Sequence, residues 1–264
     1  MEWITPNKLV VCLYKSHPES SQRSARVWRE GAALPSDIQA IRNEHVRYAY
    51  ELAKKGITWA AGPFSDFSGG LRILSVNSID EAKKATKGDP YFTNSFHYGE
   101  EFHEWIIHMP LAKASPLHKK WLEDNLKKIG IIPTKRIPEW TTPEKLFVCL
   151  CKNSSSHAQR SQKTWGAEVS PPAEIEAIRN EHLRYAYNLG ERGITWAGGP
   201  FADFSGPLSI YAVNSLEEAK KAKREDPFYK NGFVYDDVYF EWTIHGPITK
   251  ASPSHKDGLK KLYL

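Results

Sequence analysis

Two histidines, His45 and His182, occupy equivalent places in two nearly identical stretches of the chain. Each is followed by an aspartate in a Gly- and Ser-rich stretch, Asp66 after His45 and Asp203 after His182. A carboxylate that binds one imidazole nitrogen fixes the tautomer and raises the basicity of the other nitrogen, which is a general acid/base arrangement. We therefore expect two catalytic pairs, His45–Asp66 and His182–Asp203. The alternative is a core histidine bonded to a backbone carbonyl, with the aspartate capping its own turn.

The spacing of apolar residues predicts that His45 points toward a sheet. Ile38, Ile41, Tyr48 and Leu52 recur at helical intervals, and His45 lies on the same stripe at roughly 100° per residue. An imidazole that faces inward needs a partner for each ring nitrogen.

The two histidines belong to a duplication that spans the chain. Residues 1–127 align with residues 138–264 without a gap, and IRNEHVRYAY in the first half returns as IRNEHLRYAY in the second. A repeat of this length corresponds to one small domain, and two such domains on one chain imply a pseudo-twofold arrangement with two similar sites. We expect domains at 1–112 and 138–249, a linker or tail at 113–137, and a C-terminal tail at 250–264.

Each half reads as strand, helix, strand, strand, helix, strand, which is the βαββαβ order of a ferredoxin-like domain. In the first half we expect strands at 8–13, 57–64, 71–77 and 101–108, and helices at 36–55 and 79–87. The Ser-rich stretches 17–24 and 153–161 are expected to be surface loops. Helices cover one face of such a sheet. The sequence therefore predicts an α+β chain of two tandem ferredoxin-like domains that pack sheet to sheet.

Composition excludes several classes of function. The net charge of +5 is spread out without a block of five like charges, so we expect no nucleic-acid partner. The first residues lack the pattern of a signal peptide and no apolar run approaches membrane-spanning length, so we expect a cytoplasmic protein with no membrane partner. We expect Cys12, Cys149 and Cys151 to be buried structural thiols rather than a disulfide or metal site. Assembly into a homo-oligomer is left open.

The last predicted strand of each half offers a rival site. Glu104 and His108, like Glu241 and His245, are four residues apart and would share one strand face, where they could bind a metal. Two ligands per strand are too few alone, and a solvated strand edge is the alternative. The sequence contains neither a closed set of metal ligands nor a Gly-rich phosphate loop, so we expect no metal and no cofactor.

Three motifs of each half resemble the YCII-related (YciI-like) family. They are R-x-x-H-x-x-Y on the helix that carries the histidine, A-G-P-F-x-D or G-G-P-F-x-D after it, and D-P-(Y/F) near position 89 and again near position 226. The resemblance covers residues 8–108 and 145–245. It implies a dimeric α+β barrel, here formed within one chain, with His45–Asp66 and His182–Asp203 as active sites. Some relatives remove chloride from chlorinated hydroxyquinones.

Around these pairs we expect residues that bind an anionic aromatic small molecule. Arginines would hold a phenolate or carboxylate, and aromatic rings would stack on the ligand. The candidates are Arg42, Arg179, Arg23, Arg160, Phe64, Phe201, Trp28 and Trp165. The alternatives are that Arg42 pairs with Asp66 and that the tryptophans only pack.

The function that we expect is that of a lyase or dehydrochlorinase in aromatic metabolism. In it the histidine moves a proton, the aspartate orients the histidine, and the arginine stabilises oxyanion charge. A cofactor-free isomerase could use the same residues. A ligand-binding or assembly protein without turnover is the alternative from another class.

Overall fold

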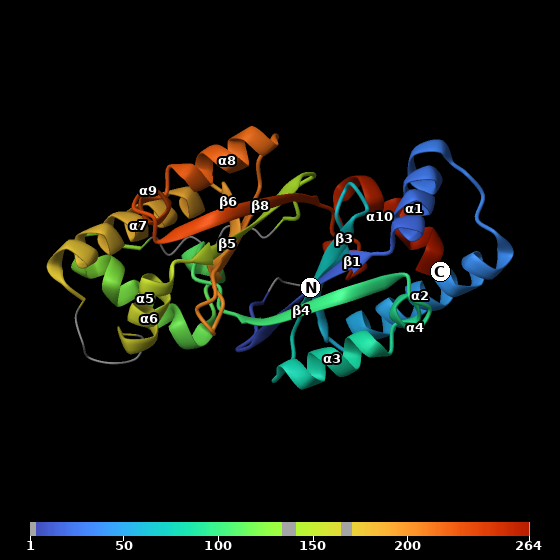
Figure 1. Ribbon diagram of the computed structural model, residues 1–264, viewed down its shortest axis with the longest axis horizontal. Helices are drawn as coiled ribbons and strands as arrows, with labels where there is room; N and C mark the ends of the chain where they lie inside the picture. Colours follow the sequence, from blue (N-terminus) through green and yellow to red (C-terminus); the bar gives the residue numbers. More distant parts are fainter. Residues whose placement is uncertain (1–3, 134–140, 165–170, 264) are drawn as a thin grey trace.

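The computed structural model describes residues 4–133, 141–164 and 171–263, and the two halves follow the same order of elements (Figure 1). The first half contains β1 (Leu9–Ser16), α1 (Pro18–Glu30), α2 (Ser36–Lys54), β2 (Thr58–Pro63), β3 (Gly69–Leu74), α3 (Ile79–Lys87), α4 (Pro90–Thr93), β4 (His97–Trp105), η1 (Leu111–Lys113) and α5 (Pro116–Lys128). The second half contains β5 (Leu146–Asn153), α6 (Ser155–Thr164), α7 (Ala173–Glu191), β6 (Thr195–Pro200), β7 (Pro207–Tyr211), α8 (Leu216–Arg224), α9 (Pro227–Lys230), β8 (Val234–Trp242), η2 (Ile248–Lys250) and α10 (Pro253–Tyr263).

Each half forms one four-stranded antiparallel sheet, in the order β2-β3-β1-β4 in the first half and β6-β7-β5-β8 in the second. The long helices α2 and α7 cover one face of their own sheets (Figure 1). This arrangement confirms the predicted α+β architecture of two tandem ferredoxin-like domains.

The other face of each sheet packs against its counterpart in the other half. Along β1, Leu9 and Val11 belong to a core cluster that also contains Val148 of β5 and Ile210 of β7. Val10, between Leu9 and Val11, belongs to a separate cluster under the helices. Successive strand residues point to opposite faces, so a strand buried on both faces reads as one apolar run.

The two sheets also join at their edges, and glycines make this possible. The indole Nε1 of Trp105 donates to the carbonyl of Gly199 at 3.1 Å, and that of Trp242 donates to the carbonyl of Gly62 at 3.0 Å. A Cβ on Gly199 would lie 1.9 Å from the carbonyl oxygen of Ile106. The glycine of the G-P-F motif is therefore required where the halves meet. Closure at both edges gives the intramolecular dimeric α+β barrel.

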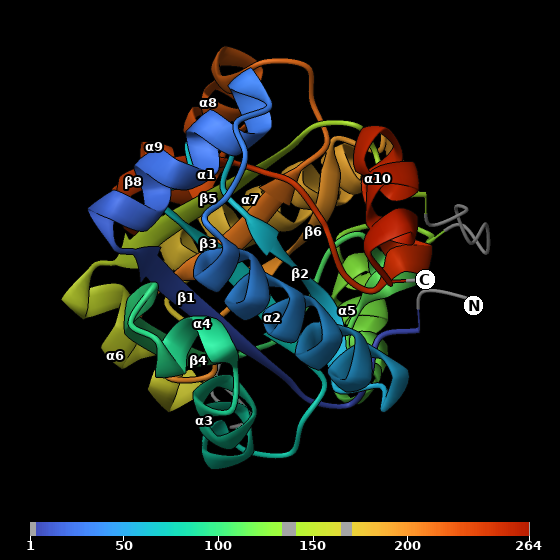
Figure 2. The same cartoon turned by 90° about the vertical axis from the view of Figure 1, so that its right-hand side faces the viewer.

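The segment after each last strand crosses to the other half. Figure 1 shows α5 beside α7 and α10 beside α2, and Figure 2 shows α10 next to α2 from the side. The guanidinium of Arg184 on α7 donates to the carbonyl of Ile129, and Arg179 donates to Asn125 Oδ1 at 3.4 Å. The segment 113–137, expected to be a linker or tail, thus places a helix against the second half.

Two expectations about local structure are wrong. The Ser-rich stretches at 17–24 and 153–161 are mostly helical, in α1 and α6, rather than loops. Pro18 fits the first turn of α1, and the Ser154 hydroxyl accepts from the His157 amide at the start of α6, so the polar residues begin these helices. The last strand of the first half runs from His97 to Trp105 rather than from 101 to 108. Within the described residues, no helix is both long and apolar enough to cross a bilayer.

Candidate functional site

His45 is paired with a carboxylate, but the partner is Asp89 rather than Asp66. His45 Nδ1 lies 2.7 Å from Asp89 Oδ1. Asp89 precedes α4, and its Oδ1 also accepts from the backbone amide of Tyr91 at 2.9 Å, which makes it the N-cap of that helix. The Tyr91 ring stacks on the imidazole, with centroids 3.9 Å apart and planes 5° from parallel.

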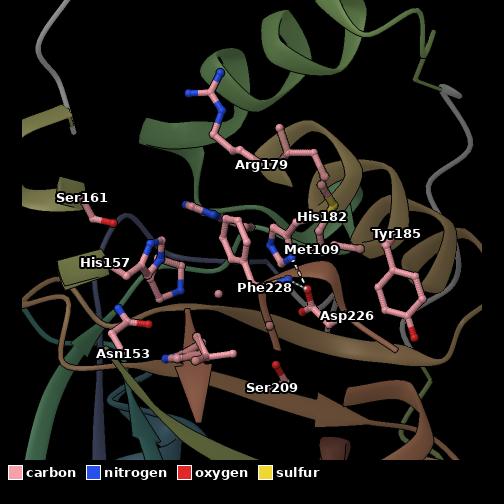
Figure 3. Close-up of a pocket in the computed structure, with 18 of the residues that line it drawn as sticks. Met109, Asn153, His157, Ser161, Arg179, His182, Tyr185, Ser209, Asp226 and Phe228 are labelled. Atoms are coloured by element: carbon pink, nitrogen blue, oxygen red, sulfur yellow. Dashed lines mark hydrogen bonds and ion pairs between the residues drawn. The ribbon is translucent and has the colours of Figure 1, made fainter. Parts of the chain in front are cut away.

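The second half repeats this geometry around His182. Its Nδ1 lies 2.7 Å from Asp226 Oδ1, which also accepts from the amide of Phe228 at 2.9 Å. The Phe228 ring stacks on the imidazole at 4.0 Å between centroids. Figure 3 shows His182 bonded to Asp226, with Phe228 beside the imidazole.

The predicted partners, Asp66 and Asp203, lie elsewhere. Each is exposed in its hairpin turn, where its Oδ1 accepts from the amide and the hydroxyl of the serine two residues later. Asp203 Oδ2 also lies 3.4 Å from His103 Nδ1 on β4. The predicted His45–Asp66 and His182–Asp203 pairings are therefore wrong. The turn places each aspartate where it caps local backbone instead of lying under the helix.

The cation that accompanies each aspartate differs between the halves. In the first half Arg72 of β3 contacts Asp89 Oδ2, and both side chains are buried, with 8% and 1% of their surface exposed. In the second half Ser209 occupies the position equivalent to Arg72, and Lys223 of α8 lies 3.7 Å from Asp226 Oδ2. One half thus supplies its cation from the sheet and the other from a helix.

These cations keep both aspartates ionised. Burial alone would raise the pKa of Asp226, but His182, Lys223 and the Phe228 amide lower it to about 2. Burial likewise opposes ionisation of Asp89, and Arg72 and His45 hold its pKa well below the usual value. An ionised carboxylate only accepts hydrogen bonds, so Nδ1 of each histidine carries the proton. Nε2 then has the free electron pair and can act as a base.

A cavity of about 360 Å³ opens beside the second pair. His182, Asp226 and Phe228 line it, and Ser209 and Asn153 on the sheet lie opposite α7 in Figure 3. The extension of the first half completes the wall with four residues, His108, Met109, His118 and Trp121. The site is therefore built from both halves of the chain.

The corresponding cavity of the first half measures about 70 Å³. Its described lining includes Tyr91, Arg23 and Arg42 but neither His45 nor Asp89. The cavity of the first half therefore does not reach the first pair.

Two further histidines of the larger cavity are held neutral. Burial lowers the pKa of His157 on α6 to about 4, with contributions from His182 and Arg160. Burial lowers the pKa of His108 to about 3. Near neutral pH both rings can hydrogen-bond to a ligand without adding charge.

The other predicted binding residues divide into two groups. Arg160 and Arg179 line the larger cavity and Arg23 and Arg42 the smaller one. Phe64 and Phe201 are 4% exposed and belong to the core cluster between the sheets, where Phe64 stacks on Phe240 and Phe201 on His103. Neither ring lines either cavity, because alternation along the chain turns both rings into the barrel. Trp165 and the side chain of Trp28 lie outside the described residues.

Several site residues were missed, although the chain contains signals for some of them. Asp89 and Asp226 recur in the D-P-(Y/F) motif of both halves, at the start of a one-turn helix. The exchange of Arg72 for Ser209 is visible when the halves are aligned, as is that of Thr86 for Lys223. No sequence pattern placed His108 in the cavity of the opposite half.

The rival metal site did not form as predicted. His108 lies beyond β4, where its amide donates to the carbonyl of Gly198 at 2.8 Å, so it does not share a strand face with Glu104. In the part of the chain that the structure describes, no three His, Cys, Asp or Glu side chains gather as a metal site. The three cysteines are buried and free.

Comparison with chlorite dismutase shows a shared fold. A double mutant of chlorite dismutase from Candidatus Nitrospira defluvii matches over 98% of this chain and 97% of that one, with a TM-score of 0.54 and 10% identity. The 5-chloro-2-hydroxyhydroquinone dehydrochlorinase from Burkholderia phenoliruptrix AC1100, solved with 2,5-dihydroxybenzoquinone, matches 36% of this chain and 89% of that one, with a TM-score of 0.25 and 21% identity. No curated protein sequence matches the chain.

The model of the YCII-related domain matches the chain twice, at residues 9–106 and 146–243. The two matches coincide with the two sheets and their helices, and each includes one His–Asp pair. The chain therefore belongs to the YCII-related family and contains the domain as a tandem duplication.

Proposed function

We propose that the chain is a lyase of the dehydrochlorinase type, which removes hydrogen halide from a compact halogenated phenol or hydroquinone at His182. The observation that carries the proposal is the 2.7 Å pair of His182 and Asp226 in the wall of a cavity of about 360 Å³. A buried carboxylate with a shifted pKa, paired with a histidine in a well-formed pocket, is the default candidate for an active site.

In the proposed reaction, His182 is the general base and Asp226 is a positioning residue. The substrate reacts as its keto tautomer, in which the halogen-bearing carbon is saturated. Nε2 takes the proton of a ring hydroxyl, the O–H electron pair forms a quinone carbonyl, and the ring double bonds shift toward the carbon–halogen bond. The carbon–halogen bond breaks, its electron pair leaves with the halide, and the imidazolium passes its proton to water. Asp226 stabilises the imidazolium through Nδ1.

The charge of the cavity supports an anionic substrate. Among its described lining residues the one acid is Asp226, which Lys223 neutralises, whereas two arginines, Arg160 and Arg179, also line the cavity. Arg179 is paired with Glu176 at 3.8 Å. Arginine is well suited to hold a phenolate or a developing oxyanion. The rings of Phe228 and Trp121 provide apolar walls for a flat molecule.

The experiment is a screen for halide release from halogenated phenols and hydroquinones, including 5-chloro-2-hydroxyhydroquinone. We expect His182→Ala to lower kcat by about 10²–10⁴-fold, the range that a general base contributes. His45→Ala is the matched control, because His45 has the same local partners but does not line the cavity.

Retention of full halide release by His182→Ala would end the proposal. Conversion of a substrate without release of halide, lost in the same variant, would identify the reaction as an isomerisation instead.

A further inference from the structure

The two His–Asp pairs differ in what lies on the sheet below them. In the first half the guanidinium of Arg72 contacts Asp89 and lies over the rings of Tyr14 and Phe92, 5.3 Å and 5.1 Å from their centroids. Arg72 and Tyr14 are both buried. The first half thus fills the space between sheet and helix with its own cation and aromatic rings.

In the second half the cation has moved from the sheet to a helix. Ser209 replaces Arg72, and Lys223 replaces Thr86. The Lys223 ammonium reaches Asp226 from α8 and is 3% exposed, so the carboxylate is still neutralised. The sheet below the pair is left with a small hydroxyl.

Two neighbouring positions also have a smaller side chain in the second half than in the first. Tyr14 is replaced by Cys151 and His97 by Val234. In the first half the rings of Tyr14 and His97 pack 4.3 Å apart between centroids. Ser209 and Val234 line the cavity of about 360 Å³ in the second half, whereas the cavity of the first half measures about 70 Å³.

We propose that the chain binds one ligand, in the second half, and that the first His–Asp pair is a closed ion-pair centre in which Arg72 occupies the place of the ligand. The ligand is a flat aromatic molecule with an anionic group, a class that rests on the proposed function. Ser209 is the residue that decides which half is open.

The first half then serves the site of the second through its extension. His108 and Trp121 line the cavity, and Asn125 of α5 accepts from Arg179 on α7. The equivalent extension of the second half, α10, packs on α2 of the first half. There Arg72 already occupies the space below the His45–Asp89 pair. The duplication has thus produced one site with a wall from each half.

The experiment measures binding stoichiometry with 4-nitrophenolate as the probe, by calorimetry and by crystal structures of the soaked protein. We expect one probe per chain, next to His182. Ser209→Arg restores the large cation of the first half and is expected to abolish saturable binding. Ser209→Ala, which keeps the space, is the matched control and is expected to bind one probe.

The converse variant is Arg72→Ser combined with Thr86→Lys, which we expect to raise the stoichiometry to two. If this double variant does not fold, the binding stoichiometries of Ser209→Arg and Ser209→Ala test the proposal without it. The proposal is overturned by two probes on the natural chain, by a probe next to His45, by unchanged binding to Ser209→Arg, or by no saturable binding to the natural chain.

The outcome is separable from that of the proposed function. One probe bound per chain, with no halide released from any compound, refutes the lyase and leaves the single site standing. Halide release that survives Ser209→Arg refutes the single site and leaves the lyase standing.

Discussion

Replacement of Arg72 by methionine is expected to destabilise the fold strongly, because it leaves a buried carboxylate without its cation. The Asp89 side chain is 1% exposed and Arg72 is 8% exposed, so water cannot take the place of the guanidinium. Removal of one partner of a buried ion pair costs about 3–5 kcal/mol. Asp89 keeps its bonds to His45 and to the Tyr91 amide, which places the expected loss near the lower end, about 3 kcal/mol. For a chain of this size that corresponds to a fall in Tm of about 6–12 °C.

The sign of the pH dependence follows from the pKa of Asp89. In the natural chain burial opposes ionisation, but Arg72 and His45 lower the pKa, so this group contributes stability above its unfolded pKa and loses it as the pH falls below that value. Without Arg72 the burial remains, and the pKa of Asp89 rises. Protonation then relieves the stranded charge, and the stability difference between Arg72→Met and the natural chain should shrink from pH 7 to pH 4.

Urea unfolding at several pH values measures both effects. Asp89→Asn supplies the control background, in which Arg72→Met should cost less than about 2 kcal/mol because no carboxylate is stranded. Lys223→Met is the matched variant of the second half. We expect it to cost about 1–2 kcal/mol, because the Lys223–Asp226 distance is 3.7 Å and Asp226 borders the cavity. A loss below about 1 kcal/mol for Arg72→Met, or an equal loss in the Asp89→Asn background, would refute the reasoning.

Three further outcomes are expected. Gly199→Ala should destabilise the protein by about 1–3 kcal/mol in thermal unfolding. Gly246→Ala, whose Cβ would meet nothing within 4 Å, should cost clearly less. Equal losses would contradict the role of Gly199 where the two sheets join. Burial lowers the pKa of Lys113 to about 7 and that of Lys250 to about 8, so unfolding takes up protons above these values and stability should rise with pH up to about 10. Replacing both lysines by methionine should flatten this rise in urea unfolding, and an unchanged slope would contradict it. Asp226→Asn should lower kcat for halide release by about 10²–10⁴-fold with little change in KM, and a change in KM alone would show that Asp226 only shapes the pocket.

Periodicity in the sequence predicted the parts of the fold that depend on local patterns. Helix α3 has the predicted bounds, Ile79–Lys87, and its Ser78 hydroxyl accepts from the Glu81 amide as an N-cap. Helix α2 was predicted to within a residue because its apolar stripe is regular and Gly56 follows it with φ 73°. Helices α1 and α6 were missed because serine occurs both in loops and at helix starts, and composition alone does not separate the two.

The site was harder to predict because its partners are distant in the chain. The repeat and the helical stripe identified His45 and His182, but each partner lies 44 residues further on, at the cap of a one-turn helix. In the sequence, Asp66 and Asp203 were equally plausible partners of the histidines, but the fold places both in exposed hairpin turns. The side chains from α5 could not be found from one half alone, because barrel closure and the crossing of the extension bring them into the cavity.

The most direct test of the central claim is histidine ¹⁵N NMR during titration with 4-nitrophenolate, with the signals assigned from His45→Gln and His182→Gln. Before the probe is added, both rings should carry their proton on Nδ1, as ionised Asp89 and Asp226 require. The Nε2 signal of His182 should then shift as the probe saturates its site, while that of His45 stays unchanged. A shift at His45, or a titration that leaves His182 Nε2 unchanged, would contradict a reaction centre at the second pair.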